Sequence, residues 1–192
     1  MSKRRVMMVL LCEDAQHEAF VRRFLKGMGW DTRQMRIEKS PMGKDSAEQW
    51  VRCRFPVELR AYRKRASRAA TVLVVVIDGD LARQPGRFQE LQRECEIQNV
   101  SFRTDGEHVA IIVPCRNIET WIQYLQGAKV NENDAYPKLS RERDCHVPVK
   151  HLLSLCKQGK LPDDAPPSMR QACDEYHERI RPIEFNNKLT AI

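Results

Sequence analysis

Three short apolar runs stand out from an otherwise polar chain: VMMVLL (6–11), TVLVVVI (71–77) and VAIIV (109–113). Each run is too short for a buried helix, and two of them are rich in β-branched residues. Such runs are typical of strands that are covered on both faces, as in a parallel sheet. The more polar segment DTRQMRIEK (31–39) is predicted to form an edge strand of the same sheet.

Segments with helical spacing separate and follow these strands. In 16–28, for example, apolar side chains recur on one face while the basic side chains point elsewhere. The predicted helices cover residues 16–28, 46–68, 87–98, 147–157 and 167–181. Strands that alternate with helices in this way predict a doubly wound α/β fold with a mainly parallel sheet.

The domain organisation is predicted from where this alternation stops. Residues 1–127 are predicted to form the α/β domain, and the polar stretch 128–145 a loop or insertion. Residues 146–192 are predicted to form a small C-terminal helical appendage that packs on the first domain. A chain of 192 residues with 42% hydrophobic residues can bury a core of this size, so disorder is not expected.

The sequence shows neither a membrane span nor a secretion signal. No apolar run approaches the roughly 20 residues that a membrane helix needs. The basic start MSKRRVMMVLLCED has too short an apolar run for a secretory signal. The seven cysteines are odd in number and none form a C-x-x-C pair. We therefore expect a reduced, cytoplasmic protein with free thiols and no membrane partner.

The charge of the chain favours a polyanionic partner. The net charge is +7, and nucleic acid is the first candidate, with DNA favoured over RNA. The predicted helix 46–68 carries basic residues four positions apart on one face, with a further basic residue beside them. Arg116 lies about one turn before Glu119, near the start of another predicted helix. The candidate phosphate-binding residues are Arg60, Arg63, Lys64, Arg68 and Arg116. A merely solvated helix face is the alternative for the basic helix.

Acidic residues come after three of the predicted strands. They are Glu13, the pair Asp78 and Asp80, and Glu119 in the first turns of the next helix. Because the carboxyl ends of neighbouring parallel strands meet at one edge, these carboxylates are expected to converge there. Like charges so close need a cation, and oxygen ligands suit Mg²⁺ or Mn²⁺. A hairpin at Asp78-Gly79 and simple helix capping by Glu13 and Asp14 are the alternatives.

Histidines add little to this picture. His17 lies one helical turn after Glu13 and can act as a proton shuttle, but we expect a first-turn histidine to face solvent. His146 and His151, with Cys145 and Cys156, fit no zinc signature.

The acidic positions resemble the Toprim domain of topoisomerases, primases and nucleases of the overcoming-lysogenization-defect type. The resemblance covers roughly residues 5–125 and consists of a glutamate after the first strand, an Asp-x-Asp after a later buried strand, and VPCRNIETW. This last stretch is similar to a Pro-x-x-x-Ile-Glu-x-Trp pattern in small prokaryotic Toprim-like proteins, many of them linked to phage defence. Asp14 stands where the family commonly has glycine, and LARQP separates Asp80 from Gly86.

The resemblance implies a Mg²⁺-dependent nuclease. Glu13 would be a general acid/base or a metal ligand, Asp78 and Asp80 would be metal ligands, and Glu119 an added ligand. It also implies a role in phage defence, with a partner ATPase that gates the nuclease.

Two alternatives stay open. One is a non-catalytic member of the same fold that only binds nucleic acid or a protein. The other is a receiver-like domain in which Asp78 accepts a phosphoryl group and Glu13 and Asp14 hold Mg²⁺. Against the receiver, no Ser/Thr-Ala comes after the fourth strand and no lysine ends a fifth. The sequence does not indicate the oligomeric state.

Overall fold

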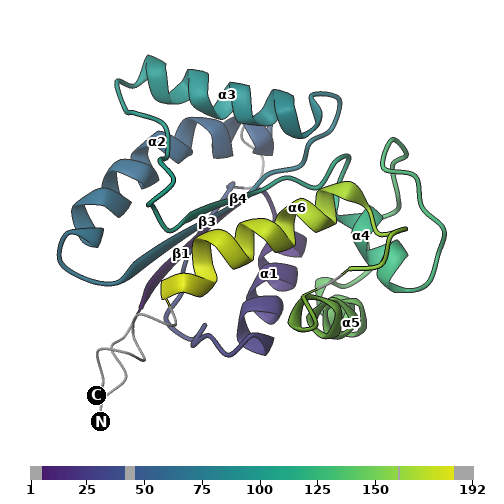
Figure 1. The fold of residues 1–192 in the computed structure, drawn as a ribbon. Helices are drawn as coiled ribbons and strands as arrows, with labels where there is room; N and C mark the ends of the chain where they lie inside the picture. The colour runs from purple at the N-terminus through teal and green to yellow at the C-terminus, as the bar shows by residue number, and fades with distance from the viewer. Residues whose placement is uncertain (1–5, 42–45, 160, 184–192) are drawn as a thin grey trace, which may run out of the picture.

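A sheet of four parallel strands lies at the centre of the molecule (Figure 1). The computed structural model describes residues 6–41, 46–159 and 161–183. The strands are β1 (Met7–Cys12), β2 (Arg36–Lys39), β3 (Thr71–Val76) and β4 (Val109–Ile112), in the spatial order β2-β1-β3-β4. The register pairs Cys12 with Val76 and Val76 with Ile112, so β1, β3 and β4 end at the same level.

The burial of each strand explains its composition. All six residues of β3 are buried, because the strand has a neighbour on both sides and helices on both faces. β2 is the short edge strand predicted from the sequence, and its first and last residues, Arg36 and Lys39, are exposed.

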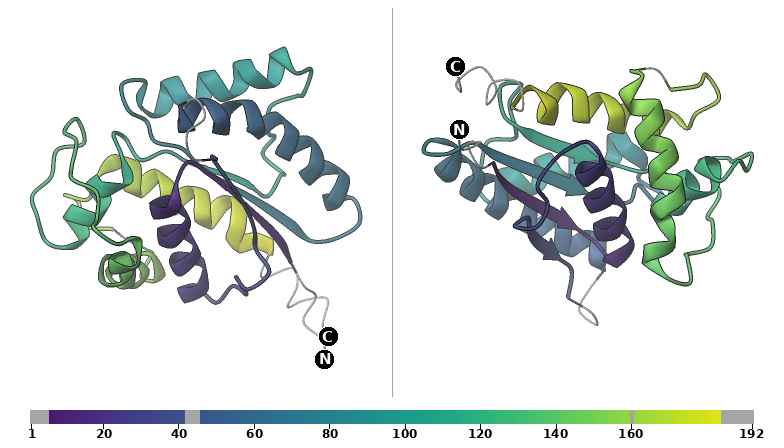
Figure 2. Two further views of the ribbon diagram at one scale, coloured as in Figure 1. Left: turned by 180° about the vertical axis from the view of Figure 1, so that it is seen from behind. Right: turned by 90° about the horizontal axis from the view of Figure 1, so that it is seen from below.

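Helices cover both faces of the sheet, which confirms the doubly wound α/β fold. The helices are α1 (Ala15–Gly27), α2 (Ala47–Ala66), α3 (Arg83–Ile97), α4 (Ile118–Leu125), α5 (His146–Lys157) and α6 (Pro167–Glu175), with a 3₁₀ turn at Glu142–Cys145 and a π turn at Tyr176–Ile180. Figures 1 and 2 show α2 and α3 on one face and α1, α4, α5 and α6 on the other. Alternate residues of β3 serve the two cores: Leu73 and Val75 face α2 and α3, and Val72 and Val74 face the opposite layer.

A side-chain pair closes the free edge of β4. Glu175, at the end of α6, accepts a hydrogen bond of 2.9 Å from the backbone N–H of Ile111. Arg103 donates to the carbonyl of Val109 at 2.6 Å and forms an ion pair with Glu175. These two side chains use the backbone groups that an unpaired strand edge would otherwise offer to another chain.

A disulfide joins two C-terminal helices. Cys156 in α5 and Cys173 in α6 are bonded, whereas the other five cysteines of the described chain form no disulfide. The expectation of free thiols throughout is therefore wrong for this pair. The two residues are 17 positions apart, and only the packing of α6 beside α5 brings them together.

The described residues contain no helix that is both long and apolar enough to cross a membrane.

Candidate functional site

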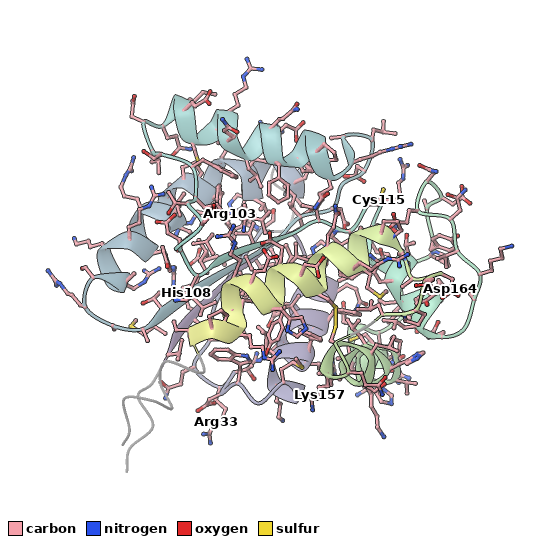
Figure 3. The ribbon with its side chains drawn as sticks, viewed as in Figure 1. Arg33, Arg103, His108, Cys115, Lys157 and Asp164 are labelled. Carbon is pink, nitrogen blue, oxygen red and sulfur yellow. A yellow bond between two sulfur atoms is a disulfide. The ribbon has the colours of Figure 1, made fainter. Side chains whose placement is uncertain are left out.

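The predicted carboxylates lie at the carboxyl ends of three neighbouring strands. Glu13 comes directly after β1, Asp78 lies two residues beyond β3, and Glu119 lies in the first turn of α4. The backbone N–H of Asp78 donates a hydrogen bond of 2.5 Å to Glu13 Oε1, which links the ends of β1 and β3. In Figure 3, Cys115 marks this end of β4 and His108 marks the opposite, amino end.

Glu119 is the most deeply buried of these acids. Its residue is 2% exposed, and its Oε1 has no hydrogen-bond partner among the described residues. Burial, followed by the negative charge of Asp78, raises the pKa of Glu119. The carboxylate therefore lies within electrostatic reach of Asp78, and one of its two oxygens has no hydrogen-bond partner among the described residues.

His17 is fully buried against this site, so the expectation that it faces solvent is wrong. Its Nε2 lies 3.0 Å from Asp78 Oδ1. The reason is the direction of α1: Asp14 caps the helix by accepting from the N–H groups of Gln16 and His17, and this turns His17 toward β3. Burial alone would lower the pKa of His17, but the charge of Asp78 and its hydrogen bond, with smaller contributions from neighbouring acids, raise it to about 9.

The pKa of Glu13 is also shifted by burial and by the charges around it. Burial is the main cause that raises the pKa of Glu13, to about 7. The charge of His17 and the hydrogen bond from Asp78 act in the opposite direction, and the charges of Asp78 and Asp80 add to the rise. Glu13 thus depends on nearby positive charge to stay ionised.

Asp80 lies at the rim and is held by an arginine that sequence reasoning missed. Its side chain is 50% exposed, and Arg87 Nη2 lies 3.2 Å from its Oδ2. Arg87 is almost completely buried, donates to the carbonyl of Asp78 at 2.7 Å, and also pairs with Glu48 and Glu90. No sequence pattern distinguishes it from the many other arginines, because its role depends on α2 and α3 lying side by side.

Gly79 fixes the loop between the two aspartates. Its N–H donates to the carbonyl of Pro114 at 2.8 Å, and the N–H of Asp80 donates to the carbonyl of Arg116 at 3.1 Å. A Cβ at position 79 would lie 2.2 Å from the carbonyl oxygen of Cys115, so only glycine fits here. The next element after Gly79 is the helix α3 rather than a strand, which excludes the β-hairpin alternative.

Lys138 adds a cation from the segment that was predicted as a loop. Its Nζ donates to Asp14 Oδ2 at 2.9 Å. The hydrogen bond to Asp14 is the main cause of the raised pKa of Lys138, and the charges of Glu119 and Asp78 contribute to it. No sequence pattern identifies Lys138, because the sequence of an irregular loop does not show which part of the folded domain the loop contacts.

The carboxylates are therefore balanced by cations of the protein itself. His17 contacts Asp78, Arg87 contacts Asp80, and Lys138 contacts Asp14. Within residues 6–41, 46–159 and 161–183, no three His, Cys, Asp or Glu side chains are grouped closely enough to hold a metal ion. Asp78 and Asp80 nevertheless each use only one carboxylate oxygen in these ion pairs, and Glu119 Oε1 has no partner in that part of the chain.

The predicted basic residues divide between the two edges of the sheet. Arg116 lies at the carboxyl edge, since its carbonyl accepts from Asp80. Arg60, Arg63 and Lys64 lie on the C-terminal half of α2, whereas Arg68 comes two residues after the helix, which ends earlier than the predicted range 46–68. Because α2 ends just before β3 begins, all four are at the amino edge of the sheet. The structure thus separates this helix face from the carboxylates.

Two of these four basic residues, Arg60 and Arg63, make contacts within the protein. Arg63 pairs with Glu107 and donates to the carbonyls of Ser101 and Phe102. Arg60 donates to the carbonyl of Gln98 at 2.9 Å. Their hydrogen bonds hold the segment before β4 against α2.

Comparison with protein-family models, with curated proteins and with solved structures finds no match for the chain. The resemblance to the Toprim domain therefore rests on the quoted motifs alone.

Proposed function

We propose that this chain is a Toprim-like nuclease that hydrolyses nucleic-acid phosphodiesters with Mg²⁺ or Mn²⁺. The observation that carries the proposal is that Glu13, Asp78 and Glu119 lie at the aligned carboxyl ends of β1, β3 and β4, where the charge of Asp78 acts on both glutamates. As they stand in the described residues, these side chains are not grouped closely enough to hold an ion, so binding requires them to draw together. Ligands of open parallel sheets bind at this edge. A buried carboxylate oxygen without a hydrogen-bond partner is costly, so Oε1 of Glu119 favours a cationic ligand at this place.

The available donors suit a hard divalent cation. Glu13, Asp78, Asp80 and Glu119 would hold it through carboxylate oxygens, which are the ligands that Mg²⁺ and Mn²⁺ prefer. A bound ion of this kind lowers the pKa of water and stabilises the charge that develops on the phosphodiester.

The protein's own residues would orient these carboxylates. His17 holds Asp78 through Oδ1, and Arg87 holds the backbone of Asp78 and the side chain of Asp80, which leaves one oxygen of each carboxylate for a ligand. Lys138 and Arg116 are cations on the same edge and would bind phosphate groups of the substrate.

Charge, cysteine pattern and family resemblance supply the substrate class and the cellular context of the proposed nuclease. The net charge of +7 favours nucleic acid as the substrate, and we favour DNA. The cysteine pattern favours a cytoplasmic location, and the family resemblance favours a role in phage defence and a gating ATPase partner.

A nuclease assay tests the proposal. Purified wild-type protein is incubated with labelled single-stranded and duplex DNA, with Mg²⁺ or Mn²⁺ and with EDTA. We expect cleavage that EDTA abolishes and that falls more than about 100-fold in Asp78→Asn and in Glu119→Gln, because each loses a charged ligand. The matched control is Asp174→Asn, an exposed aspartate on α6. Cleavage that persists in both site variants contradicts the assignment. Binding without any cleavage by the wild type favours the non-catalytic alternative.

A further inference from the structure

Leu81 is an apolar side chain displayed beside the carboxylates. It comes after Asp80 in the loop between β3 and α3 and is 86% exposed, compared with 65% for Ile97 and 57% for Val147. A leucine that is left in water forgoes roughly 1.5–3 kcal/mol of burial free energy. Single exposed leucines are common, so the exposure gains meaning only from what surrounds it.

The loop that carries Leu81 is held in one conformation. Asp80 and Arg83 have φ angles of 44° and 56°, a region that costs free energy for residues other than glycine. Backbone hydrogen bonds hold the loop at both ends. The N–H of Asp80 donates to the carbonyl of Arg116, and the N–H of Arg83 donates to the carbonyl of Gly79 at 2.8 Å. The buried guanidinium of Arg87 donates a hydrogen bond to the carbonyl of Asp78, just before this loop. Leu81 is therefore presented to solvent by a supported loop.

Two arginines lie close to Leu81 along the backbone: Arg83 comes two residues later, and the carbonyl of Arg116 accepts from the N–H of Asp80. Arg83 is exposed and Arg116 half-buried, and neither side chain has a hydrogen bond or ion pair with the described residues. Burial raises the pKa of Cys115, and the positive charge of Arg83 opposes that rise, so the guanidinium lies close to the residue that precedes Arg116. The loop Asp80–Arg83 thus presents an apolar side chain and one cation without an ion pair, and the adjacent segment after β4 contributes a second such cation, Arg116.

We propose that the loop Asp80–Arg83 is a nucleic-acid-gripping element, in which Leu81 packs on an unstacked base while Arg83 and Arg116 bind the flanking phosphates. This inference rests on the proposed function and names the substrate as a polymer with exposed bases. A small phosphoester or a base-free polyanion offers Leu81 no apolar surface. Apolar side chains placed against bases beside phosphate-binding cations are a general means of holding nucleic acid.

The test measures binding in EDTA, so that it does not depend on cleavage. The probes are a fluorescent single-stranded DNA oligonucleotide and fluorescent heparin, a polyanion without bases. We expect Leu81→Ser to weaken DNA binding about tenfold and to leave heparin binding unchanged. Arg83→Ala and Arg116→Ala should weaken binding of both probes and each reduce the slope of log K against log salt by about one.

Matched controls come from the opposite edge of the sheet. Ile97→Ser removes an exposed apolar side chain at the far end of α3, and Lys26→Ala removes an exposed cation in the last turn of α1. Both should bind DNA like the wild type. Wild-type DNA affinity in Leu81→Ser overturns the inference, as does an equal loss for heparin or a larger loss in Lys26→Ala than in Arg116→Ala. Unaltered circular dichroism of each variant excludes misfolding.

The two proposals fail separately. If Leu81→Ser behaves as predicted but the wild type never cleaves DNA, the gripping loop stands and the nuclease proposal falls. If the wild type cleaves DNA but Leu81→Ser binds it normally, the nuclease proposal stands and the gripping loop falls. Absence of any DNA binding overturns the gripping loop directly.

Discussion

His17 Nε2 lies 3.0 Å from Asp78 Oδ1, and this contact joins the first turn of α1 to the end of β3 inside the protein. The imidazole is completely buried, which alone would lower its pKa. The negative charge of Asp78 and its hydrogen bond raise the pKa of His17 to about 9, so the imidazole is protonated at neutral pH. A fixed cation thus holds one oxygen of the central carboxylate and determines how that carboxylate is oriented.

Replacing His17 should therefore destabilise the fold. His17→Ala leaves Asp78 without its cation and opens a cavity, which should lower the free energy of unfolding by about 2–4 kcal/mol. Urea denaturation at pH 7 measures the change. His146→Ala, at an exposed position at the start of α5, is the control and should change stability little. An equal effect of the two substitutions would show that the contact with Asp78 contributes nothing.

Gly79→Ala should disrupt the loop between the aspartates. The added Cβ meets backbone oxygens of Cys115 and Pro114 at 2.2 and 2.8 Å, and backbone cannot move aside as a side chain can. We expect a loss of about 3 kcal/mol in thermal or urea denaturation. Gly106→Ala is the control, since a Cβ there meets nothing within 4 Å. Wild-type stability of Gly79→Ala would be incompatible with this close approach.

The ion pair between Arg63 and Glu107 should make stability depend on pH. Burial would raise the pKa of Glu107, but hydrogen bonds from Arg63 and Thr104 outweigh it and hold the pKa below its ordinary 4.5. A depressed carboxyl pKa stabilises the fold above the unfolded value, and this stabilisation is lost as the pH falls through the folded value. Glu107→Gln should therefore cost about 1–2 kcal/mol at pH 7, and the difference should shrink below about pH 4.5.

The control for this prediction is Lys64→Ala, next to Arg63 but exposed on α2. It should leave stability unchanged at every pH. A difference between Glu107→Gln and wild type that stays constant down to pH 3 would contradict the role given to the ion pair.

Protein purified without reductant should contain five reactive thiols after denaturation, since Cys156 and Cys173 are bonded. The bond closes a loop across a separation of 17 residues, so its reduction should lower stability by about 3 kcal/mol. A thiol titration in guanidinium, with and without prior reduction, measures the count, and Cys173→Ser should make stability insensitive to reductant. A count of seven would contradict the bond and favour a reducing compartment.

The sequence was sufficient to predict what depends on local pattern. Buried runs such as 71–77 can only be central strands of a parallel sheet, and that topology brings Glu13 and Asp78 to one edge. It was insufficient wherever a role depends on packing between distant elements. Burial of His17 depends on how α1 lies on the sheet, and Arg87 gains its partners only because α2 and α3 are neighbours.

The basic residues predicted on α2 are a second case in which packing between elements, not local sequence pattern, decides where side chains lie. Arg60 and Lys64 are exposed on α2 as their spacing indicates, whereas Arg68 lies beyond the end of the helix, and spacing does not say which end of the sheet these residues reach. In a right-handed βαβ unit the helix runs back to the start of the next strand, so residues late in α2 lie away from the strand ends that carry the carboxylates.

Direct measurement of Mn²⁺ binding tests the central claim, that the carboxylates at the ends of β1, β3 and β4 form a divalent metal site. Electron paramagnetic resonance of free Mn²⁺, titrated with the protein, gives the affinity without any substrate. The wild type and Asp174→Asn should bind Mn²⁺ saturably, and Asp78→Asn and Glu119→Gln should bind it at least about tenfold more weakly, because each removes a charged oxygen ligand. The absence of saturable binding by the wild type, or equal affinity in all four proteins, would contradict the site.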